Sequence, residues 1–213
     1  MEAIAQSGEE GLTLLMDYLL VLQSSQSLEP TNIANGKIYQ VLYSAQTDAT
    51  QDFLATHFPT GILPLESQRG VDYTKLQTLL AKQEFEDADR ITIQKLCELV
   101  GDAAIRRKWL YFTEVQSIPV EDLRLIDTLW MLHSEGKFGY SVQREIWLGV
   151  NKDWDRLWPK IGWRSEAAWT RYPQEFIWDL SAPRGHLPLS NQLRGVRVMQ
   201  MLMTHPAWTE SQN

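Results

Sequence analysis

Helical spacing of apolar residues is the feature that most limits the fold of this 213-residue chain. Residues 12–22 are apolar on most sides of a helix, which predicts a helix buried between others. No segment shows a convincing alternation of apolar and polar residues, the pattern typical of a strand. We therefore expect an all-α protein, with further helices over residues 33–43, 49–58, 83–100 and 190–204.

Residues that favour helix ends support this reading. Asp72 and Ser141 are each placed to cap the start of a helix. Pro119 suits the first turn of another helix, and Gly101 suits a C-terminal stop. His57 precedes a proline and has no second ligand at helical spacing, so it is predicted as a helix-end residue.

Composition changes along the chain and predicts two domains. The segment from residue 59 to residue 70 holds two prolines and two glycines, which break helix periodicity. Residues 1–69 carry two basic and eight acidic side chains, whereas all nine tryptophans lie from Trp109 onwards. We expect a small N-terminal helical bundle over residues 1–69, including a linker from about residue 59, an all-helical second domain over residues 70–206, and a tail over residues 207–213.

The overall composition limits the class of protein. The chain is 44% hydrophobic and 22% charged, as in soluble globular proteins, and no apolar run approaches the roughly 18 residues of a membrane span. The first residues resemble neither a signal peptide nor a transit peptide, so we expect a cytoplasmic protein, with peripheral membrane association left open. A net charge of −7 argues against nucleic acid as the main partner. Cys97 is predicted to be buried among apolar neighbours.

Three segments carry a resemblance to a known family: residues 118–130, beginning Ile-Pro-Val-Glu-Asp-Leu-Arg, residues 136–147, beginning Gly-Lys-Phe-Gly-Tyr, and residues 181–188, Ser-Ala-Pro-Arg-Gly-His-Leu-Pro. Together with residues 71–80 and 85–89, their order and spacing resemble the Genomes Uncoupled four family, tetrapyrrole-binding regulators of magnesium chelatase. The resemblance extends over residues 70–206. It implies an all-α domain shaped like a cupped hand that holds a porphyrin, often preceded by a helical bundle.

The resemblance also implies a function. Such a protein is not an enzyme: it binds protoporphyrin IX and Mg-protoporphyrin IX and stimulates magnesium chelatase in chlorophyll biosynthesis. Its partner is the large porphyrin-binding subunit of the chelatase, and we expect the protein itself to be a monomer. No catalytic cofactor and no protein ligand to a metal is expected.

A porphyrin has a wide apolar face and two propionates, so its site needs apolar walls and Arg or amide donors. Asn191 and Arg194 are three residues apart and fall on one face at the start of the predicted last helix. A guanidinium near the positive end of a helix suits a carboxylate. In the resemblance these two residues match an Asn and an Arg that contact the ligand. A surface salt bridge is the alternative for Arg194.

The apolar wall is predicted in the loop between helices ending near Lys108 and starting near Pro119. The resemblance places Phe112, Val115 and Ile118 there, on a loop that lines the palm. Core packing is the alternative for each of them. Tyr172 and Leu193 are further candidates for contacts with the ligand.

Other residues that could bind a ligand have simpler readings. The arginines at positions 171, 184 and 197 are expected to be solvated or paired, although each could reach a propionate. His133 and His186 could ligate a haem iron, but a helix-end or loop role is favoured. Four tryptophans stand at helical spacing beside Leu and Ile and are expected in the core: Trp130, Trp147, Trp154 and Trp158.

Two other functional classes were considered. A hydrolase could use Glu121, Asp122 or Asp127, but the two aspartates are five residues apart and diverge on a helix. No nucleophile elbow or phosphate-binding loop is present in the sequence. Asp122 is expected in the first turn of its helix, and Asp127 in a buried hydrogen bond. The third class is a helical interaction module or signalling domain without a role at the chelatase.

Overall fold

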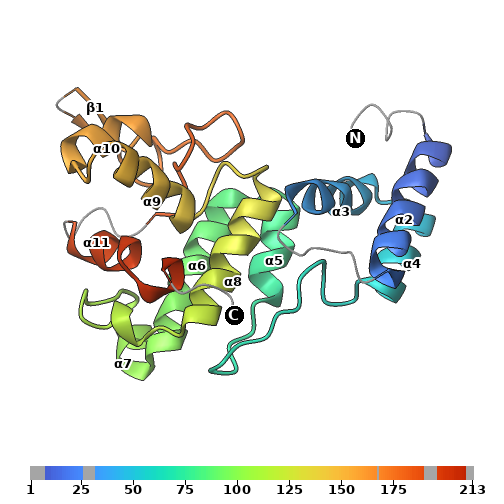
Figure 1. Ribbon diagram of the computed structural model, residues 1–213, viewed down its shortest axis with the longest axis horizontal. Helices are drawn as coiled ribbons and strands as arrows, with labels where there is room; N and C mark the ends of the chain where they lie inside the picture. Colours follow the sequence, from blue (N-terminus) through green and yellow to red (C-terminus); the bar gives the residue numbers. More distant parts are fainter. Residues whose placement is uncertain (1–7, 26–31, 167, 190–195, 210–213) are drawn as a thin grey trace.

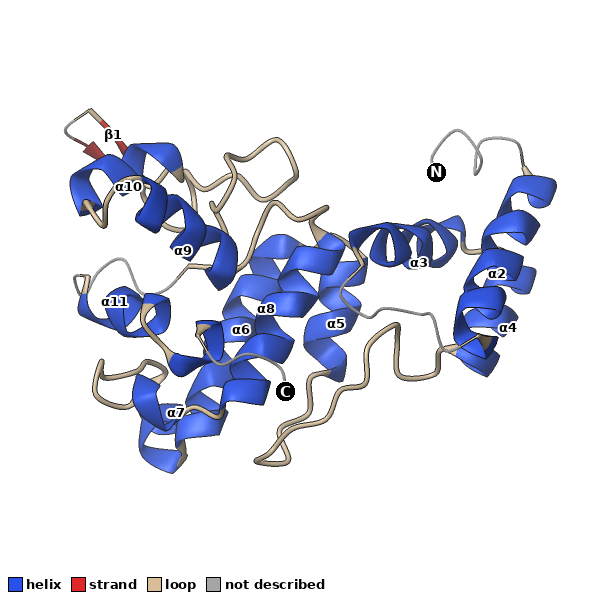
Figure 2. Cartoon of the chain, in the orientation of Figure 1, coloured by secondary structure: helices blue, strands red, loops and turns tan. Residues whose placement is uncertain are grey.

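The computed structural model describes residues 8–25, 32–166, 168–189 and 196–209, and almost all of its regular structure is helical (Figures 1 and 2). The only strands in these residues form a short antiparallel hairpin of β1 (Arg164–Ser165) and β2 (Ala168–Trp169). The prediction of an all-α protein is therefore confirmed. The helices are α2 (Glu9–Ser24), α3 (Ile33–Ala45), α4 (Asp48–His57), α5 (Thr74–Ala81), α6 (Phe85–Val100), α7 (Asp102–Arg107), α8 (Val120–His133), α9 (Tyr140–Gly149), α10 (Trp154–Lys160) and α11 (Arg197–Met203), with 3-10 turns η1 (Val115–Ser117) and η3 (Pro206–Trp208).

Helices α2, α3 and α4 pack on one another at one end of the molecule, and α3 also contacts α8 in the rest of the chain (Figure 1). Helix α3 lies close against α8 because Gly36 has no side chain: a Cβ there would stand 2.9 Å from the carbonyl oxygen of Leu132. Lys37 of α3 also forms an ion pair with Glu135 at 2.7 Å. These contacts fix α3 on the end of α8.

Helices α5, α6 and α8 form the centre of the second half of the chain (Figure 1). Trp130 of α8 is fully buried, stacks on Phe85 with ring centroids 5.9 Å apart, and donates its indole N–H to Thr92 Oγ1 at 2.9 Å. A buried indole that keeps a hydrogen-bond partner avoids the cost of an orphaned donor. In the described chain, no helix is both long enough and apolar enough to cross a bilayer.

The tryptophans beyond α8 form a stacked row. The ring centroids of Trp147, Trp154, Trp158 and Trp163 follow one another at 5.1, 5.2 and 5.7 Å. Trp130, Trp147 and Trp158 are buried and Trp154 is partly buried against the core, which confirms their predicted structural role. The row packs α9 and α10 onto the β-hairpin.

Several predicted helix ends are confirmed. Helix α4 ends at His57, and α6 stops at Gly101, whose φ of 123° favours glycine. The predicted cap at Asp72 is one residue early: Tyr73 is the N-cap of α5, although the Asp72 carboxylate accepts the Thr74 amide at 2.8 Å. Pro119, predicted in the first turn, is instead the N-cap residue directly before α8.

The predicted cap at Ser141 is wrong. Helix α9 begins at Tyr140 after Gly139, and the Ser141 amide donates to Asp127 Oδ1 of α8 at 2.8 Å. The acceptor for the first turn of α9 thus comes from a neighbouring helix. Local spacing cannot reveal such a tertiary cap, although it did suggest a buried hydrogen bond for Asp127.

Candidate functional site

The loop between α7 and α8 is held in place by Arg107. Its guanidinium forms an ion pair with Glu114 at 2.5 Å and lies over the Tyr111 ring, 4.4 Å from the centroid. The Glu114 carboxylate also accepts the Tyr111 amide at 2.8 Å. A charged pair that also binds the backbone orders the loop more than an isolated surface ion pair would.

The three apolar residues predicted on this loop differ in exposure. Phe112 is 36% exposed, whereas Val115 and Ile118 are 0% and 3% exposed and belong to the core. A ligand could reach Val115 or Ile118 only if the side chains that cover them moved. In the described conformation, Phe112 alone of the three is exposed at the surface. Val115 and Ile118 pack into the core and support the loop from inside the protein.

Helix α11 packs against this loop. The guanidinium of Arg197, the first residue of α11, lies 5.2 Å from the centre of the Phe112 ring. His205, just after α11, hydrogen-bonds through Nε2 to the Ile118 carbonyl at 3.1 Å. The described chain provides no carboxylate ion pair for Arg197. An exposed aromatic face and a cation therefore meet at one place, from elements 85 residues apart in sequence.

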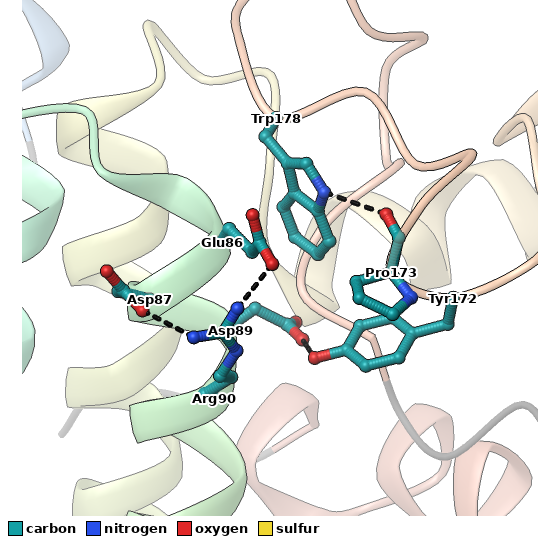
Figure 3. Close-up of polar contacts among 7 residues, drawn as sticks. All are labelled: Glu86, Asp87, Asp89, Arg90, Tyr172, Pro173 and Trp178. Atoms are coloured by element: carbon teal, nitrogen blue, oxygen red, sulfur yellow. Dashed lines mark hydrogen bonds and ion pairs between the residues drawn. The ribbon is translucent and has the colours of Figure 1, made fainter.

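A buried carboxylate, Asp89 of α6, joins two further segments of the candidate site (Figure 3). One carboxylate oxygen accepts the Leu189 amide at 2.6 Å, and the other accepts the Tyr172 hydroxyl at 3.2 Å. Burial raises the pKa of Asp89 from its ordinary value of 3.8 to about 7, although both hydrogen bonds oppose the shift. Asp89 thus holds both Tyr172 and Leu189 in place.

Tyr172 lies at the edge of an aromatic group. Its ring contacts Phe176 and Trp178, with centroids 5.6 and 5.8 Å away, and the Trp178 indole donates to the Pro173 carbonyl at 3.0 Å (Figure 3). Tyr172 is only partly buried. Burial raises the pKa of the Tyr172 hydroxyl well above its ordinary range, which keeps it a hydrogen-bond donor to Asp89.

Three predicted ligand residues, Asn191, Leu193 and Arg194, lie outside the described residues, and their roles stay predictions. The described part of the last helix starts at Arg197. The described chain on either side is anchored: Leu189 binds Asp89, and Arg197 covers Phe112.

Two of the other arginines are paired at the surface. Arg184 binds Glu145, and Arg171 lies 3.7 Å from Glu175. This pairing matches the simpler expectation for both.

The two histidines considered as haem ligands have structural surroundings. His186 is held in its loop by two hydrogen bonds, from Nδ1 to the Ile161 carbonyl at 2.7 Å and from the Ile177 amide to Nε2 at 3.2 Å. His133 is buried at the end of α8 beside Tyr39, and burial lowers its pKa to about 4. In the described chain, no group of three or more His, Cys, Asp or Glu could hold a metal ion.

The acidic residues of α8 serve the fold. Asp122 lies in the first turn, as expected, but its carboxylate accepts the Tyr73 hydroxyl at 2.6 Å and the Gln68 amide at 3.1 Å. The Asp122 carboxylate therefore connects α8 to Gln68 of the linker and to Tyr73, instead of accepting hydrogen bonds from the first backbone amides of its own helix. Asp127 forms the predicted buried hydrogen bond.

Asp89 itself was not predicted as part of the site. A signal was present: Phe85, Asp89, Thr92 and Leu96 follow one another at spacings of four, three and four, so an acidic residue stands on the buried face of α6. An acid on an apolar stripe requires a partner, since a lone buried charge is costly. The partners, however, lie 83 and 100 residues away.

Comparison with known proteins identifies the family. A model of the GUN4-like family matches residues 66–206, and a model of the ARM-like repeat domain at the GUN4 N-terminus matches residues 1–59. This chain belongs to the GUN4-like family. The resemblance read from the sequence is confirmed.

Relatives and solved structures agree with this assignment. A Ycf53-like protein of Synechocystis is 51% identical over 208 residues, covering 98% of this chain and 88% of that protein. The chloroplastic tetrapyrrole-binding protein of Arabidopsis thaliana is 42% identical over 142 residues, 62% of this chain and 54% of that protein. The structure of GUN4 from Chlamydomonas reinhardtii superposes with a TM-score of 0.65 at 43% identity, covering 70% of this chain and 95% of that chain. Ligand-free Arabidopsis GUN4 gives 0.60 at 40% identity, with coverage of 67% and 98%.

Proposed function

We propose that this GUN4-like protein is a non-catalytic regulator that binds protoporphyrin IX and Mg-protoporphyrin IX and stimulates magnesium chelatase through its large porphyrin-binding subunit. It acts as a cytoplasmic monomer in chlorophyll biosynthesis. The observation that carries the proposal is the meeting of the exposed Phe112 ring with the Arg197 guanidinium. The name of the Arabidopsis relative supports a tetrapyrrole as the ligand.

The chemistry of this place suits a porphyrin. Phe112 and the partly buried Tyr172 would offer apolar contact to the flat face of the macrocycle, while Arg194, Arg197 and the Asn191 amide would offer donors to the propionates. Each ~100 Å² of buried apolar surface contributes roughly 2.5 kcal/mol, so a few hundred Å² supports about micromolar affinity after association costs. The protein does not need to ligate the magnesium for this binding.

The test is a titration with a water-soluble protoporphyrin analogue and its magnesium form, followed by quenching of tryptophan fluorescence. We expect saturable binding by the wild type, weakened about tenfold or more by Phe112→Ala and by Arg194→Ala or Arg197→Gln. Arg171→Gln is the matched control, because that arginine is exposed and pairs with Glu175. Esterifying both propionates should remove the difference between the wild type and the Arg197 variant. Absence of saturable binding would refute the proposal.

A second stage tests the regulatory role. Wild-type protein should stimulate magnesium insertion by reconstituted chelatase, and the Phe112→Ala variant should do so only at higher concentration. If porphyrin binds but the chelatase is not stimulated, the carrier part stands and the regulatory part fails. The alternative of an interaction module or signalling domain would then lead.

A further inference from the structure

One face of α2 is not covered by any part of the described chain. Leu14, Tyr18 and Val21 are 64%, 48% and 62% exposed, and their spacings of four and three put them in one line along the helix. This line, the α2 stripe, lies roughly 130° around the axis from the residues that α2 buries, at 100° per residue. Those buried residues face α3 and α4: Leu12, Leu15 and Leu19. Single exposed apolar residues are ordinary, but three in line on one helix mark an interaction surface.

The surroundings of the α2 stripe are acidic. Glu10 and Asp17 fall on the same side of α2 as the stripe and are exposed. In the described residues of α2, α3 and α4 the only lysine or arginine is Lys37, and it forms an ion pair with Glu135 of the other half of the chain. The exposed acids of these helices therefore have no nearby base of their own domain to offset them: Glu9, Glu10, Asp17, Asp48 and Asp52.

This charge pattern decides between possible partners. A second copy of the chain would bring the same acids against one another across a two-fold interface, and like charges there oppose association. A basic partner would instead gain both the apolar contact and the charge complementarity. A single exposed helical ridge is suited to another amphipathic helix, which packs its apolar residues beside the ridge.

We propose that the α2 stripe docks a basic amphipathic helix of another protein. The apolar face of that helix contacts Leu14, Tyr18 and Val21, and its Lys or Arg residues lie beside Glu10 and Asp17. Figure 1 places α2 at the opposite end of the molecule from α7 and its following loop. The docking surface is thus separate from the proposed porphyrin site, and each can be tested without the other.

The probe is a labelled synthetic peptide of about 18 residues, roughly five helical turns, with Leu at helical spacing and Lys on the flanks. Its binding to the full chain is measured by fluorescence anisotropy beside a matched peptide in which every Lys is Glu. We expect the Lys peptide to bind saturably, more weakly as salt increases, and about tenfold or more tighter than the Glu peptide. Equal binding of both peptides, or of neither, would overturn the proposal.

Variants locate the binding. Combining Leu14→Gln with Val21→Gln should weaken the Lys peptide about tenfold or more, and both sites are exposed, so folding should be retained. Ile105→Gln, at an apolar residue 43% exposed on α7, is the matched control and should leave the affinity unchanged. Neutralising Glu10 and Asp17 together should reduce the salt dependence. Unchanged binding in the Leu14 and Val21 variant would contradict the assignment.

The same variants would reveal whether something other than a basic helix covers the α2 stripe. If sedimentation shows a wild-type dimer that Leu14→Gln abolishes, a second copy covers the stripe and the proposal is wrong. If the Lys peptide does not bind and Leu14→Gln lowers the melting temperature as a buried substitution would, the chain's own terminal residues cover the stripe, and the proposal is again wrong. Porphyrin titration of the Leu14 and Val21 variant should match the wild type in every case.

Discussion

Replacing Asp89 by Asn should make the protein more stable at alkaline pH and change its stability much less at acid pH. Asp89 is buried, and burial raises its pKa from 3.8 to about 7. Asn keeps an oxygen for the Leu189 amide, and its NH₂ group can donate to the Tyr172 hydroxyl in place of the present bond. The substitution therefore removes the charge while both connections are retained.

The sign and size of the change in unfolding free energy with pH follow from proton linkage. Above about pH 7 the carboxylate is ionised in both the folded and the unfolded chain, so the full cost of burying the charge is present. Between about pH 7 and 3.8 the folded chain takes up a proton that the unfolded chain does not, and the free energy of unfolding increases as pH falls. Since each pH unit in this range contributes a little over 1 kcal/mol, the wild type gains roughly 2–3 kcal/mol between pH 8.5 and pH 5 from Asp89.

The assay is urea unfolding of the wild type and Asp89→Asn at a series of pH values, followed by circular dichroism. The difference in unfolding free energy between the two should decrease by roughly 2–3 kcal/mol from pH 8.5 to pH 5. Asp87→Asn is the control, because it removes a carboxylate from an exposed position on the same helix. A difference for Asp89→Asn that does not vary with pH would refute the reasoning, because it would mean that burial does not perturb this carboxyl.

Three further substitutions or reactions test the packing. Val115→Ala should cost about 2 kcal/mol, measured by urea unfolding, because the side chain is fully buried; a cost near zero would mean that it faces a ligand cleft. Gly36→Ala should cost about 1–3 kcal/mol, since its Cβ would press on the Leu132 carbonyl, whereas Gly149→Ala, whose Cβ would meet nothing within 4 Å, should not destabilise the chain. The Cys97 thiol is buried and its pKa is raised to about 11, so it should react with a thiol reagent at about pH 8 only after unfolding; rapid reaction in the native state would contradict this.

Local signals in the sequence were sufficient to predict the all-α fold class and several helix ends. Gly101 and His57 end helices because of their own backbone and neighbours, so short-range patterns locate them. The start of α9 was misplaced at Ser141 because its acceptor, Asp127, stands fourteen residues earlier on another helix. A cap supplied by tertiary packing has no signature within the helix that it caps.

The candidate site was harder to predict for the same physical reason. The resemblance pointed to Phe112, Val115 and Ile118 together, but a loop has no fixed periodicity, so only the packed structure separates the exposed Phe112 ring from the two buried side chains. Arg197 was one of three undecided arginines, and its position over Phe112 distinguishes it from the two that pair at the surface. Long-range contacts such as Asp89 with Leu189 cannot be read from one sequence.

These contacts imply that ligand affinity depends on residues that need not touch the ligand. Asp89 fixes Leu189, and the core residue Val115 supports the loop that carries Phe112. Arg197 of α11 lies over the Phe112 ring. Because a displacement of the supporting residues would move an apolar wall relative to the guanidinium, a truncation at Val115 should weaken porphyrin binding without removing any ligand contact. A change at Asp89 should do the same only if, unlike Asn, it breaks the hydrogen bonds to Leu189 and Tyr172.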